Sequence, residues 1–407
     1  MNGAMKNGLP WLGGLTAGAF LRDYWQKKPL LIRNAFSGVR EPLSPDELAG
    51  LACEGGVESR LICRKGGTGR KSWSVDYGPF EEDLFSRLPE KRWTLLVQEV
   101  NRHVPEVATL LDHFSFVPNW RVDDVMISYA TDGGGVGPHI DSYDVFLLQG
   151  LGKRRWRYHQ KKTTRVTFID NLPLRILEHF EPEADEVLGP GDMLYLPPGF
   201  AHDGVAVGEC TTYSIGFRAP NRAELTAAFV RSFATADAMS DLYEDPDLQA
   251  GSEPGELTAA ARERVREMIR RIDLGDDAID AAFARFASIL KPGHTLEAPR
   301  RMLTVAQVKE RLVRGDALVR SEEGRFVFFP SSKLTINFFY GGHQEALKGS
   351  AANLARVVSR HRILDLAALG KSTALTKDGL LVLTRWINNG ALSFTTLGPL
   401  PCYGETR

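Results

Sequence analysis

Short strand-like runs, each bounded by glycine or proline, fill the first 220 residues of this 407-residue chain. Three stretches show the pattern clearly: VDDVMISYATDGGG, YDVFLLQGLGKRRWRYH and EVLGPGDMLYLPPGFAH. β-Branched and aromatic residues favour strands, whereas Gly and Pro favour the turns between them. Because many short strands separated by turn signals are typical of all-β architectures, we expect residues 1–220 to form a mainly β domain.

The pattern becomes helical between residues 221 and 295. The stretches AELTAAFVRSFATADAMSDLY, ELTAAARERVREMIRRID and DDAIDAAFARFASIL repeat apolar residues at spacings of three and four. From residue 296 onward, helical and strand-like runs alternate, as in TVAQVKERLVRG, GRFVFFP and LTINFFYGG. We therefore expect a β domain over 1–220, a helical segment over 221–295 and a small winged-helix-like α+β domain over 296–407.

The composition excludes several classes of protein. Hydrophobic residues make up 43% and charged residues 25% of the chain, as in ordinary globular proteins. The 50 Lys and Arg residues nearly cancel the 51 Asp and Glu residues, so no overall charge draws the chain to nucleic acid or membrane. No apolar run approaches the ~18 residues of a membrane span. The N-terminus lacks a signal-peptide core and the four cysteines form no CxxC pair, so we expect a cytoplasmic protein with reduced thiols.

Two histidines and one aspartate form the most informative pattern in the chain. His139 and Asp141 are two residues apart, and residues i and i+2 of a strand point to the same face. His202 lies just past a strand predicted for Met193–Leu196 and the turn that Pro197–Gly199 imposes. Two His and one carboxylate on the inner wall of a β-barrel make a facial triad, which suits non-haem Fe(II) and oxygen chemistry. Zinc is the alternative metal, but its structural sites are closed by four N or S ligands.

An isolated His-x-Asp pair is weak evidence, because such pairs also occur by chance. Here the pair follows a glycine loop, leads into a strand, and is accompanied by basic residues on the next strand and a distal His after a Pro-Gly turn. The joint pattern favours a metal site. The remaining histidines have no partner at ligand spacing and are interpreted as structural or surface residues: His103, His113, His159, His179, His294, His343 and His361.

An arginine on the strand after the His-x-Asp pair is a candidate for binding an anion. The turn Gly150–Gly152 starts a new strand at Lys153, whose side chains alternate between two faces. Arg154 shares its face with Trp156 and Tyr158, and this aromatic content predicts that the face lies inside the barrel. A dicarboxylate that chelates iron at one end would offer its far carboxylate to Arg154 for a bidentate salt bridge.

Ser128 is a second candidate for contacting the same ligand. On the strand before the His-x-Asp pair, Met126, Ser128 and Ala130 share one face, and Ile127 and Tyr129 share the other. If the first face is the inner one, Ser128 donates a hydrogen bond to the ligand and Ala130 leaves it room. The sequence alone does not decide which face is inside.

Three further polar residues flank this region. The loop TDGGGVG lacks the GK[ST] ending of a phosphate loop and opens no helix, so we expect it to provide backbone space beside the site. Asp132, Tyr143 and Asp144 are candidates for lining a substrate channel. A role in a turn or at the surface fits each of them equally well.

Several stretches of the chain resemble a known family. FLRDYWQKKPLLIRNAF, DDVMISYATDGGGVGPHIDSYDVFLLQGLGKRRWRY, PGDMLYLPPGFAHDGVA and YSIGFRAP are similar to the JmjC-type 2-oxoglutarate oxygenases, above all to the bacterial ribosomal oxygenases. The resemblance implies a double-stranded β-helix, that is, a jelly-roll or cupin-like barrel. It further implies Fe(II) held by His139, Asp141 and His202, with 2-oxoglutarate and O₂ as co-substrates. Arg154, where many JmjC enzymes have Lys, is similar to the residue that pairs with the far carboxylate of 2-oxoglutarate, and Ser128 is placed to assist it.

The same resemblance implies a function and partners. Members of this group hydroxylate an arginine of large-subunit ribosomal protein sixteen, and they carry a helical dimerisation segment and a C-terminal winged-helix domain. We therefore expect a protein hydroxylase that forms a homodimer and does not bind nucleic acid directly. The alternatives are a histidyl hydroxylase of another ribosomal protein, a cupin-type metalloenzyme acting on a small molecule, and a binding protein with a degenerate barrel.

Overall fold

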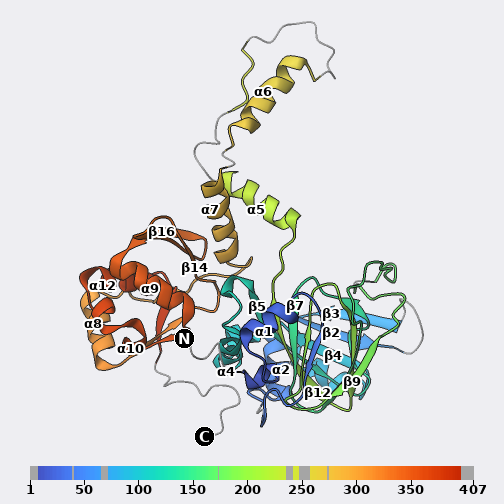
Figure 1. Ribbon diagram of the computed structural model, residues 1–407. Helices are drawn as coiled ribbons and strands as arrows, with labels where there is room; N and C mark the ends of the chain where they lie inside the picture. Colours follow the sequence, from blue (N-terminus) through green and yellow to red (C-terminus); the bar gives the residue numbers. More distant parts are fainter. Residues whose placement is uncertain are drawn as a thin grey trace. The chain divides into compact units, whose positions relative to one another are not determined.

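The computed structural model describes residues 8–38, 41–65, 72–172, 174–234, 242–246, 257–272 and 275–395. These residues fall into two compact units, which divide between Ala219 and Pro220. Figure 1 colours the chain from the blue N-terminal unit to the red end of the C-terminal unit. The further boundary that the sequence predicts near residue 295 lies within the second unit and stays a prediction.

The N-terminal unit is built on a large antiparallel sheet. Its eight strands have the order β1-β10-β7-β12-β5-β4-β2-β3. The strands are β1 (Leu30–Ile32), β2 (Ser59–Arg64), β3 (Trp73–Tyr77), β4 (Trp93–Val97), β5 (Val122–Ala130), β7 (Asp144–Gln149), β10 (Met193–Leu196) and β12 (Cys210–Phe217). The predicted strand over Met193–Leu196 is confirmed as β10.

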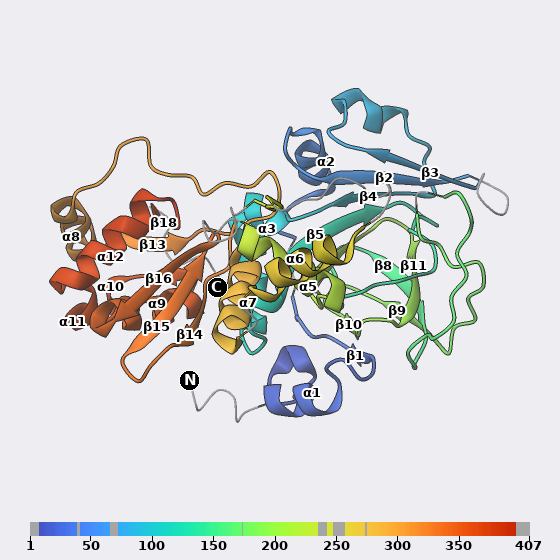
Figure 2. The same cartoon turned by 90° about the horizontal axis from the view of Figure 1, so that it is seen from above.

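A smaller sheet of the order β6-β11-β8-β9 faces the large one (Figure 2). Its strands are β6 (His139–Ile140), β8 (Lys153–Tyr158), β9 (Ala184–Leu188) and β11 (Ala201–Val207). From β5 to β12 the chain passes repeatedly between the two sheets, which is the connectivity of a jelly roll. The expected β class is confirmed, although the two sheets face each other and do not close into one continuous barrel.

The period-two alternation of the strands gives the large sheet two apolar faces. On β7, Phe146 and Leu148 belong to a core under the N-terminal helices, whereas Val145 and Leu147 pack toward Trp156 of the smaller sheet. Phe20 of the first helix contacts Phe146 with ring centroids 5.5 Å apart. The helices of this unit are η2 (Pro10–Leu12), α1 (Ala17–Asp23), α2 (Pro45–Cys53), η4 (Glu82–Arg87), α3 (Val100–His103), α4 (Pro105–Ala108), η5 (Thr109–Phe114) and η6 (Asn119–Arg121). Because both faces are covered, the space between the sheets is shielded from solvent and suited to a site.

The second unit begins with three helices, as the sequence predicts. They are α5 (Arg222–Ala234), α6 (Ala259–Arg270) and α7 (Asp276–Ser288), and the predicted continuation of the first helix over 235–241 lies outside the described residues. Helix α7 contacts α5 and the strands β14 and β15. Helix α6 has no buried residue.

The rest of the second unit mixes short helices with two three-stranded sheets, of orders β17-β13-β18 and β14-β15-β16. Helix α8 (Val305–Arg314) begins at the capping box of Thr304 and Gln307 and ends at Gly315 in the left-handed conformation, where glycine has no steric penalty. The other elements are β13 (Ala317–Arg320), β14 (Val327–Pro330), β15 (Thr335–Tyr340), β16 (His343–Lys348), α9 (Gly349–Arg360), β17 (Ile363–Leu364), α10 (Leu366–Leu369), α11 (Lys371–Ala374), α12 (Lys377–Asn388) and β18 (Leu392–Thr395). The mixed α+β character expected here is confirmed.

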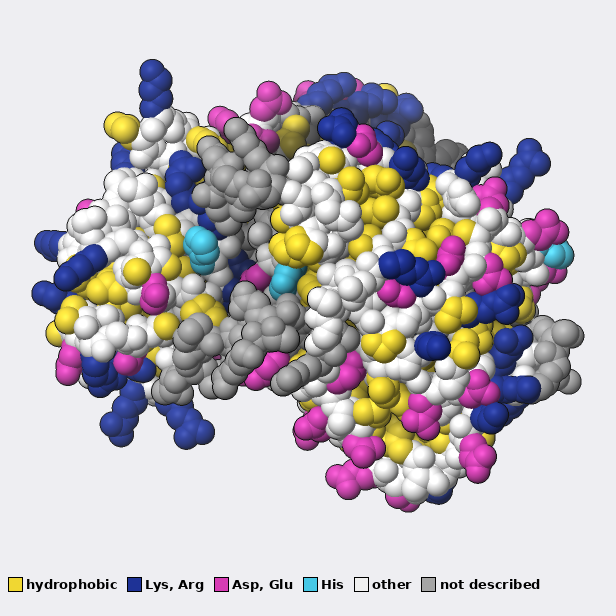
Figure 3. All heavy atoms as spheres, turned by 60° about the horizontal axis from the view of Figure 1, so that its bottom comes forward, with side chains coloured by type: hydrophobic (Ala, Val, Ile, Leu, Met, Phe, Trp, Pro, Cys, Tyr) yellow, Lys and Arg dark blue, Asp and Glu magenta, His cyan; other side chains and the backbone are white. Residues whose placement is uncertain are grey.

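The surface carries both signs of charge. On the face in Figure 3, Lys and Arg side chains are interspersed with Asp and Glu. Among the described helices, none combines the length and the apolar character that a membrane crossing requires.

Candidate metal centre

The two predicted histidines and the aspartate lie together at one end of the smaller sheet. His139 on β6 pairs in register with His202 on β11, and Asp141 follows β6 directly. The Nε2 atoms of His139 and His202 lie 3.8 Å and 3.5 Å from the carboxylate oxygens of Asp141. The three ligand atoms are within 4.8 Å of one another. The sequence places His202 just past the end of the preceding strand, and in the structure it is the second residue of the next strand, β11.

Backbone carbonyls orient both imidazoles. The Nδ1 atoms of His139 and His202 donate to the carbonyls of Gly137 (2.8 Å) and Phe200 (3.0 Å). A proton held at Nδ1 leaves the Nε2 lone pair free toward the shared point, as a metal ligand requires. Burial, reinforced by the neighbouring His139, lowers the pKa of His202 to about 4, so its neutral, metal-binding form dominates at neutral pH.

The donor set fits the metal that the sequence predicts. Two imidazole nitrogens and one carboxylate leave coordination positions open, which distinguishes this site from a closed structural zinc site. Within the described ranges, this is the one group of His, Cys, Asp and Glu residues with metal-binding geometry.

A cavity of about 320 Å³ extends from the triad between the two sheets. The large sheet contributes Met126, Ser128 and Thr212 to its wall, and the smaller sheet contributes Arg154 and Trp156. Met126 and Ser128 therefore lie on the inner face of β5, which answers the question that the sequence left open. The hydroxyl of Thr212 donates to Gln149 (3.2 Å).

Arg154 lies inside this cavity, and the predicted alternation along β8 is confirmed. Arg154 is 4% exposed, whereas Lys153 and Arg155 are exposed. The Nε and Nη2 atoms of Arg154 are buried without a hydrogen-bond partner among the described residues. Arg155, on the outer face, forms an ion pair with Asp185. A buried guanidinium with unused donors is costly, and an anionic ligand in the cavity would satisfy it.

Trp156 lies between Arg154 and the triad. Its ring centroid is 5.8 Å from the Arg154 Cζ and 5.9 Å from the centroid of the His202 ring. Its Nε1 is also buried without a partner in the described part of the chain. The indole fits here because residue 204, its partner on β11, is glycine.

The glycine loop gives backbone space beside the site, as expected. Gly133 donates to the carbonyl of Ala206 (3.0 Å), and Ala206 donates to the carbonyl of Gly134 (2.9 Å). A Cβ on Gly135 would lie 2.5 Å from the carbonyl oxygen of Gly204. The loop therefore packs against β11, the strand that carries His202.

Of the three candidates for a substrate channel, Tyr143 lines the cavity. Asp132 lies at the surface, where it pairs with Lys91 (3.1 Å) and accepts from the backbone of Gly208 (3.0 Å). Asp144 is fully buried on the face of β7 that points away from the cavity. It lies two residues before Phe146, so both side chains point to the core under the N-terminal helices.

Asp144 has its own polar partners on that face. It accepts hydrogen bonds from Tyr195 (2.6 Å) and Gln26 (2.9 Å) and pairs with Arg121 (2.9 Å). Asp132 and Asp144 thus stabilise the fold, and neither lines the cavity.

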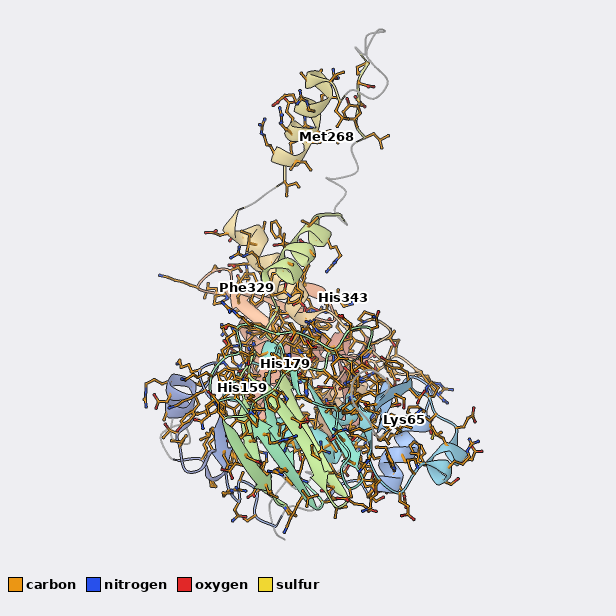
Figure 4. The ribbon with its side chains drawn as sticks, turned by 90° about the vertical axis from the view of Figure 1, so that its right-hand side faces the viewer. Lys65, His159, His179, Met268, Phe329 and His343 are labelled. Carbon is orange, nitrogen blue, oxygen red and sulfur yellow. The ribbon has the colours of Figure 1, made fainter. Side chains whose placement is uncertain are left out.

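The remaining histidines for which contacts are known have structural or surface surroundings. His159 bonds to Thr163 (3.0 Å) and stacks on Phe180, whereas His179 is largely exposed (Figure 4). In the C-terminal unit, His294 pairs with Glu323 (3.1 Å).

Several cavity residues were not singled out from the sequence. Thr94 on β4, Arg60 on β2 and Arg175 in the loop after β8 all line the cavity. No motif marks them, because their strands or loops precede or follow the His-x-Asp region. A second cavity of about 380 Å³ shares Asp141, Tyr143 and Arg175 with the first and opens beside the triad.

Comparison with known proteins places the chain in a family. Residues 109–225 match the JmjC domain. Over 301 residues the chain is 38% identical to the ribosomal protein uL16 3-hydroxylase of Escherichia coli, covering 74% of this chain and 79% of that protein. The chain belongs to the JmjC-domain ribosomal oxygenases. This ribosomal oxygenase is also 41% identical over 235 residues to a probable ribosomal oxygenase of Haemophilus influenzae, covering 58% of this chain and 55% of that protein.

Solved structures agree with this assignment. The ribosomal oxygenase resembles the X-ray structure of E. coli YcfD with a TM-score of 0.78 at 33% identity, covering 94% of this chain and 98% of that one. A structure of E. coli YcfD in complex with cobalt and 2-oxoglutarate matches with a TM-score of 0.74 at 33% identity, covering 93% and 98%.

Proposed function

We propose that this ribosomal oxygenase uses Fe(II), 2-oxoglutarate and O₂ to hydroxylate a side chain of ribosomal protein uL16. The observation that carries the proposal is the buried, unpartnered guanidinium of Arg154 in the same cavity as the triad. A cupin-type metalloenzyme that acts without a dicarboxylate has no need of such a cation. Two comparisons with E. coli proteins support the proposal: a relative by sequence is a uL16 3-hydroxylase, and a similar solved structure holds cobalt and 2-oxoglutarate.

His139, Asp141 and His202 would hold the iron. When bound, the metal supplies the oxidising chemistry that splits O₂ and decarboxylates 2-oxoglutarate, and the protein supplies position and a water-poor cavity. The carbonyls of Gly137 and Phe200 fix the two rings with Nε2 toward the metal.

Arg154 would bind the far carboxylate of 2-oxoglutarate with its unused Nε and Nη2 donors. Ser128 lies on the facing sheet, is 3% exposed, and would donate to the same ligand. The indole of Trp156 closes the wall between Arg154 and the triad, so the co-substrate would lie against it. These contacts would orient the 2-oxo acid end toward the triad.

The substrate side chain would approach through the second cavity, which shares Asp141 and Tyr143 with the first. The substrate residue proposed is an arginine of uL16, as expected from the resemblance of the sequence. The site of action is then the cytoplasm, where ribosomes are assembled, and the substrate is a protein and not a nucleic acid.

The helical segment 221–295 would form the interface of a homodimer. Val265 and Ile269, one turn apart on α6, are 49% and 61% exposed, and Val230 of α5 is also exposed. An amphipathic helix with no buried residue needs a partner to cover its apolar stripe. We propose a second copy of the chain as this partner.

The proposal is tested with purified protein, Fe(II), 2-oxoglutarate and a uL16 fragment. Succinate release that depends on the fragment, together with a fragment mass raised by one oxygen atom, is the expected result. His139→Ala removes one ligand and should abolish both signals, whereas His179→Ala, at an exposed site, should retain them.

The alternative functions predict different results. A histidyl hydroxylase would place the oxygen on a histidine of another ribosomal protein, which peptide sequencing by mass spectrometry would reveal. A metalloenzyme acting on a small molecule would release no succinate with any ribosomal protein, and that result would contradict the proposal.

A further inference from the structure

The pairing of strands brings Thr94 and Arg154 to the same end of the cavity. Arg154 on β8 pairs with Ala206 on β11. Ala206 packs against Ala130 in a small buried cluster that joins the two sheets. Ala130 in turn pairs with Thr94 on β4. Paired residues of antiparallel strands point to the same face of their sheet. Thr94 therefore shares a face with Ala130 in the large sheet, and Arg154 shares a face with Ala206 in the smaller sheet. Thr94 and Arg154 thus approach the Ala130–Ala206 contact from opposite sheets.

The hydroxyl of Thr94 has no hydrogen-bond partner in the described part of the chain. Thr94 is fully buried and lines the cavity, and its Oγ1 makes no hydrogen bond with any described residue. A buried hydroxyl without a partner costs ~1–3 kcal/mol. Such a group is retained at this cost where a ligand satisfies it.

The glycine loop encloses Thr94 on one side. A Cβ on Gly134 would lie 3.1 Å from the Thr94 Oγ1. The N–H of Gly134 donates to Thr131 and its carbonyl accepts from Ala206, and neither group bonds to the Thr94 hydroxyl. Thr94 and Arg154 both line the cavity, so a ligand bound there is the candidate partner for the hydroxyl.

This end of the cavity lies at a fixed distance from the triad. Tyr158, four residues beyond Arg154 on β8, pairs with His202. Four residues of a strand span ~13 Å, and the Arg154 Cζ lies 5.8 Å from the ring centroid of Trp156, which is two residues nearer to the pair with His202. A short dicarboxylate with one end at the triad would suit this length.

We propose that Thr94 determines co-substrate specificity: its hydroxyl donates to the distal carboxylate that Arg154 holds, and its position at the closed end limits the length of the dicarboxylate. The inference rests on the proposed use of 2-oxoglutarate. It adds a further residue that binds this co-substrate and a reason why longer 2-oxo diacids bind more weakly. Thr94 is a positioning residue, since it does not contact the metal.

The test measures binding, not turnover. Calorimetry of the full chain, loaded with Mn(II) in place of iron and kept free of oxygen, gives Kd for 2-oxoglutarate and for the longer 2-oxoadipate. Thr94→Val removes the hydroxyl at nearly constant shape, Thr94→Ser keeps it, and Thr94→Ala shortens the side chain. Thr109→Val is the matched control, because Thr109 is equally buried but donates to Glu106 far from the cavity wall.

We expect Thr94→Val to weaken 2-oxoglutarate binding by about tenfold or more, since a hydrogen bond to a charged group contributes ~1.5–3 kcal/mol. Thr94→Ser and Thr109→Val should stay within about threefold of the wild type. Thr94→Ala should reduce the preference for 2-oxoglutarate over 2-oxoadipate by about tenfold, the effect of one methylene in a fitted pocket.

Two results would overturn the inference. If Thr94→Val binds 2-oxoglutarate as the wild type does while Arg154→Ala does not bind it, Thr94 has no role and the proposed function stands. If the wild type itself shows no saturable binding, the proposed co-substrate is wrong and the inference falls with it.

Discussion

The indole of Trp156 packs directly on Gly204, its pairing partner on the neighbouring strand. A Cβ at residue 204 would lie 2.6 Å from Cζ3 of the ring, closer than real contacts allow. This contact holds the indole between Arg154 and His202, where it forms the cavity wall. The absence of a side chain at one residue of β11 therefore determines the shape of the cavity.

Gly204→Ala tests this relationship. The added methyl must displace the indole into the cavity, so we expect 2-oxoglutarate affinity to fall by about tenfold and stability to fall by ~1–3 kcal/mol from overpacking. Binding of Mn(II) alone should change little, because the triad is untouched. Calorimetry and urea unfolding measure these quantities. Gly189→Ala is the control, because a Cβ there would meet no atom within 4 Å and the backbone of Gly189 is not left-handed.

Arg154→Ala should weaken 2-oxoglutarate binding by about tenfold or more and leave metal binding intact. The variant deprives a desolvated carboxylate of its counter-charge, which typically costs ~2–5 kcal/mol. Arg154→Lys should restore only part of the affinity, since an ammonium offers a point charge where the guanidinium offers two aligned donors. Titration of the Mn(II)-loaded protein with 2-oxoglutarate measures the effect.

Arg155→Ala is the matched control on the opposite face of β8. Arg155 pairs with Asp185 at the surface, and exposed pairs of this kind contribute little to stability. We expect normal 2-oxoglutarate affinity in this variant. If Arg155→Ala weakened binding and Arg154→Ala did not, the assignment of the inward cation would be wrong.

The metal-free protein should lose stability as pH falls from 7 to 5, in part through His202. The pKa of His202 is about 4 in the folded state and near 6.5 when unfolded, so in this window the unfolded chain binds the additional proton. The free energy of unfolding therefore rises with pH across the window, and His202 accounts for about 2 kcal/mol of the rise between pH 5 and pH 7. His202→Gln should remove this part of the pH dependence. Urea unfolding at pH 5 and at pH 7 measures the free energy of unfolding of both proteins. An equal change between the two pH values in wild type and variant would contradict the role of His202.

The homodimer rests on the exposed apolar stripe of α6. Ile269→Glu places a charge in the proposed interface, so we expect the sedimentation mass to change from two chains to one at micromolar concentration. Arg266→Glu, whose side chain is exposed on the same helix, controls for a general effect on the helix. A wild-type mass of one chain at this concentration would exclude the dimer.

The elements with strong local signals could be predicted from the sequence. The glycine turn before β8 determines which residues share a face, and the aromatic residues Trp156 and Tyr158 on the face of Arg154 predict that it is the inner one. The three helices of the second unit and the strand β10 follow from periodicity and from their Gly and Pro boundaries. The convergence of His139, Asp141 and His202 follows from two short motifs, whereas the pairing of the strands that carry the two histidines does not.

Other parts of the site depend on long-range packing. Thr94 lies more than forty residues before the metal ligands and reaches the cavity only because β4 pairs with β5. Asp144 begins β7, and its face is decided by how that strand packs against α1 and not by its own neighbours in sequence. The unused donors of Arg154 and Thr94 likewise become apparent only when all surrounding groups are in place.

The central claim is that this protein hydroxylates uL16, and the mass of uL16 in cells tests it most directly. Ribosomal proteins are compared from cells with the protein, cells without it, and cells that carry only the His202→Ala variant. The account predicts that uL16 carries one additional oxygen, on an arginine, in the first case alone. An unmodified uL16 in cells that contain the active protein, or an equal modification in all three, would contradict it.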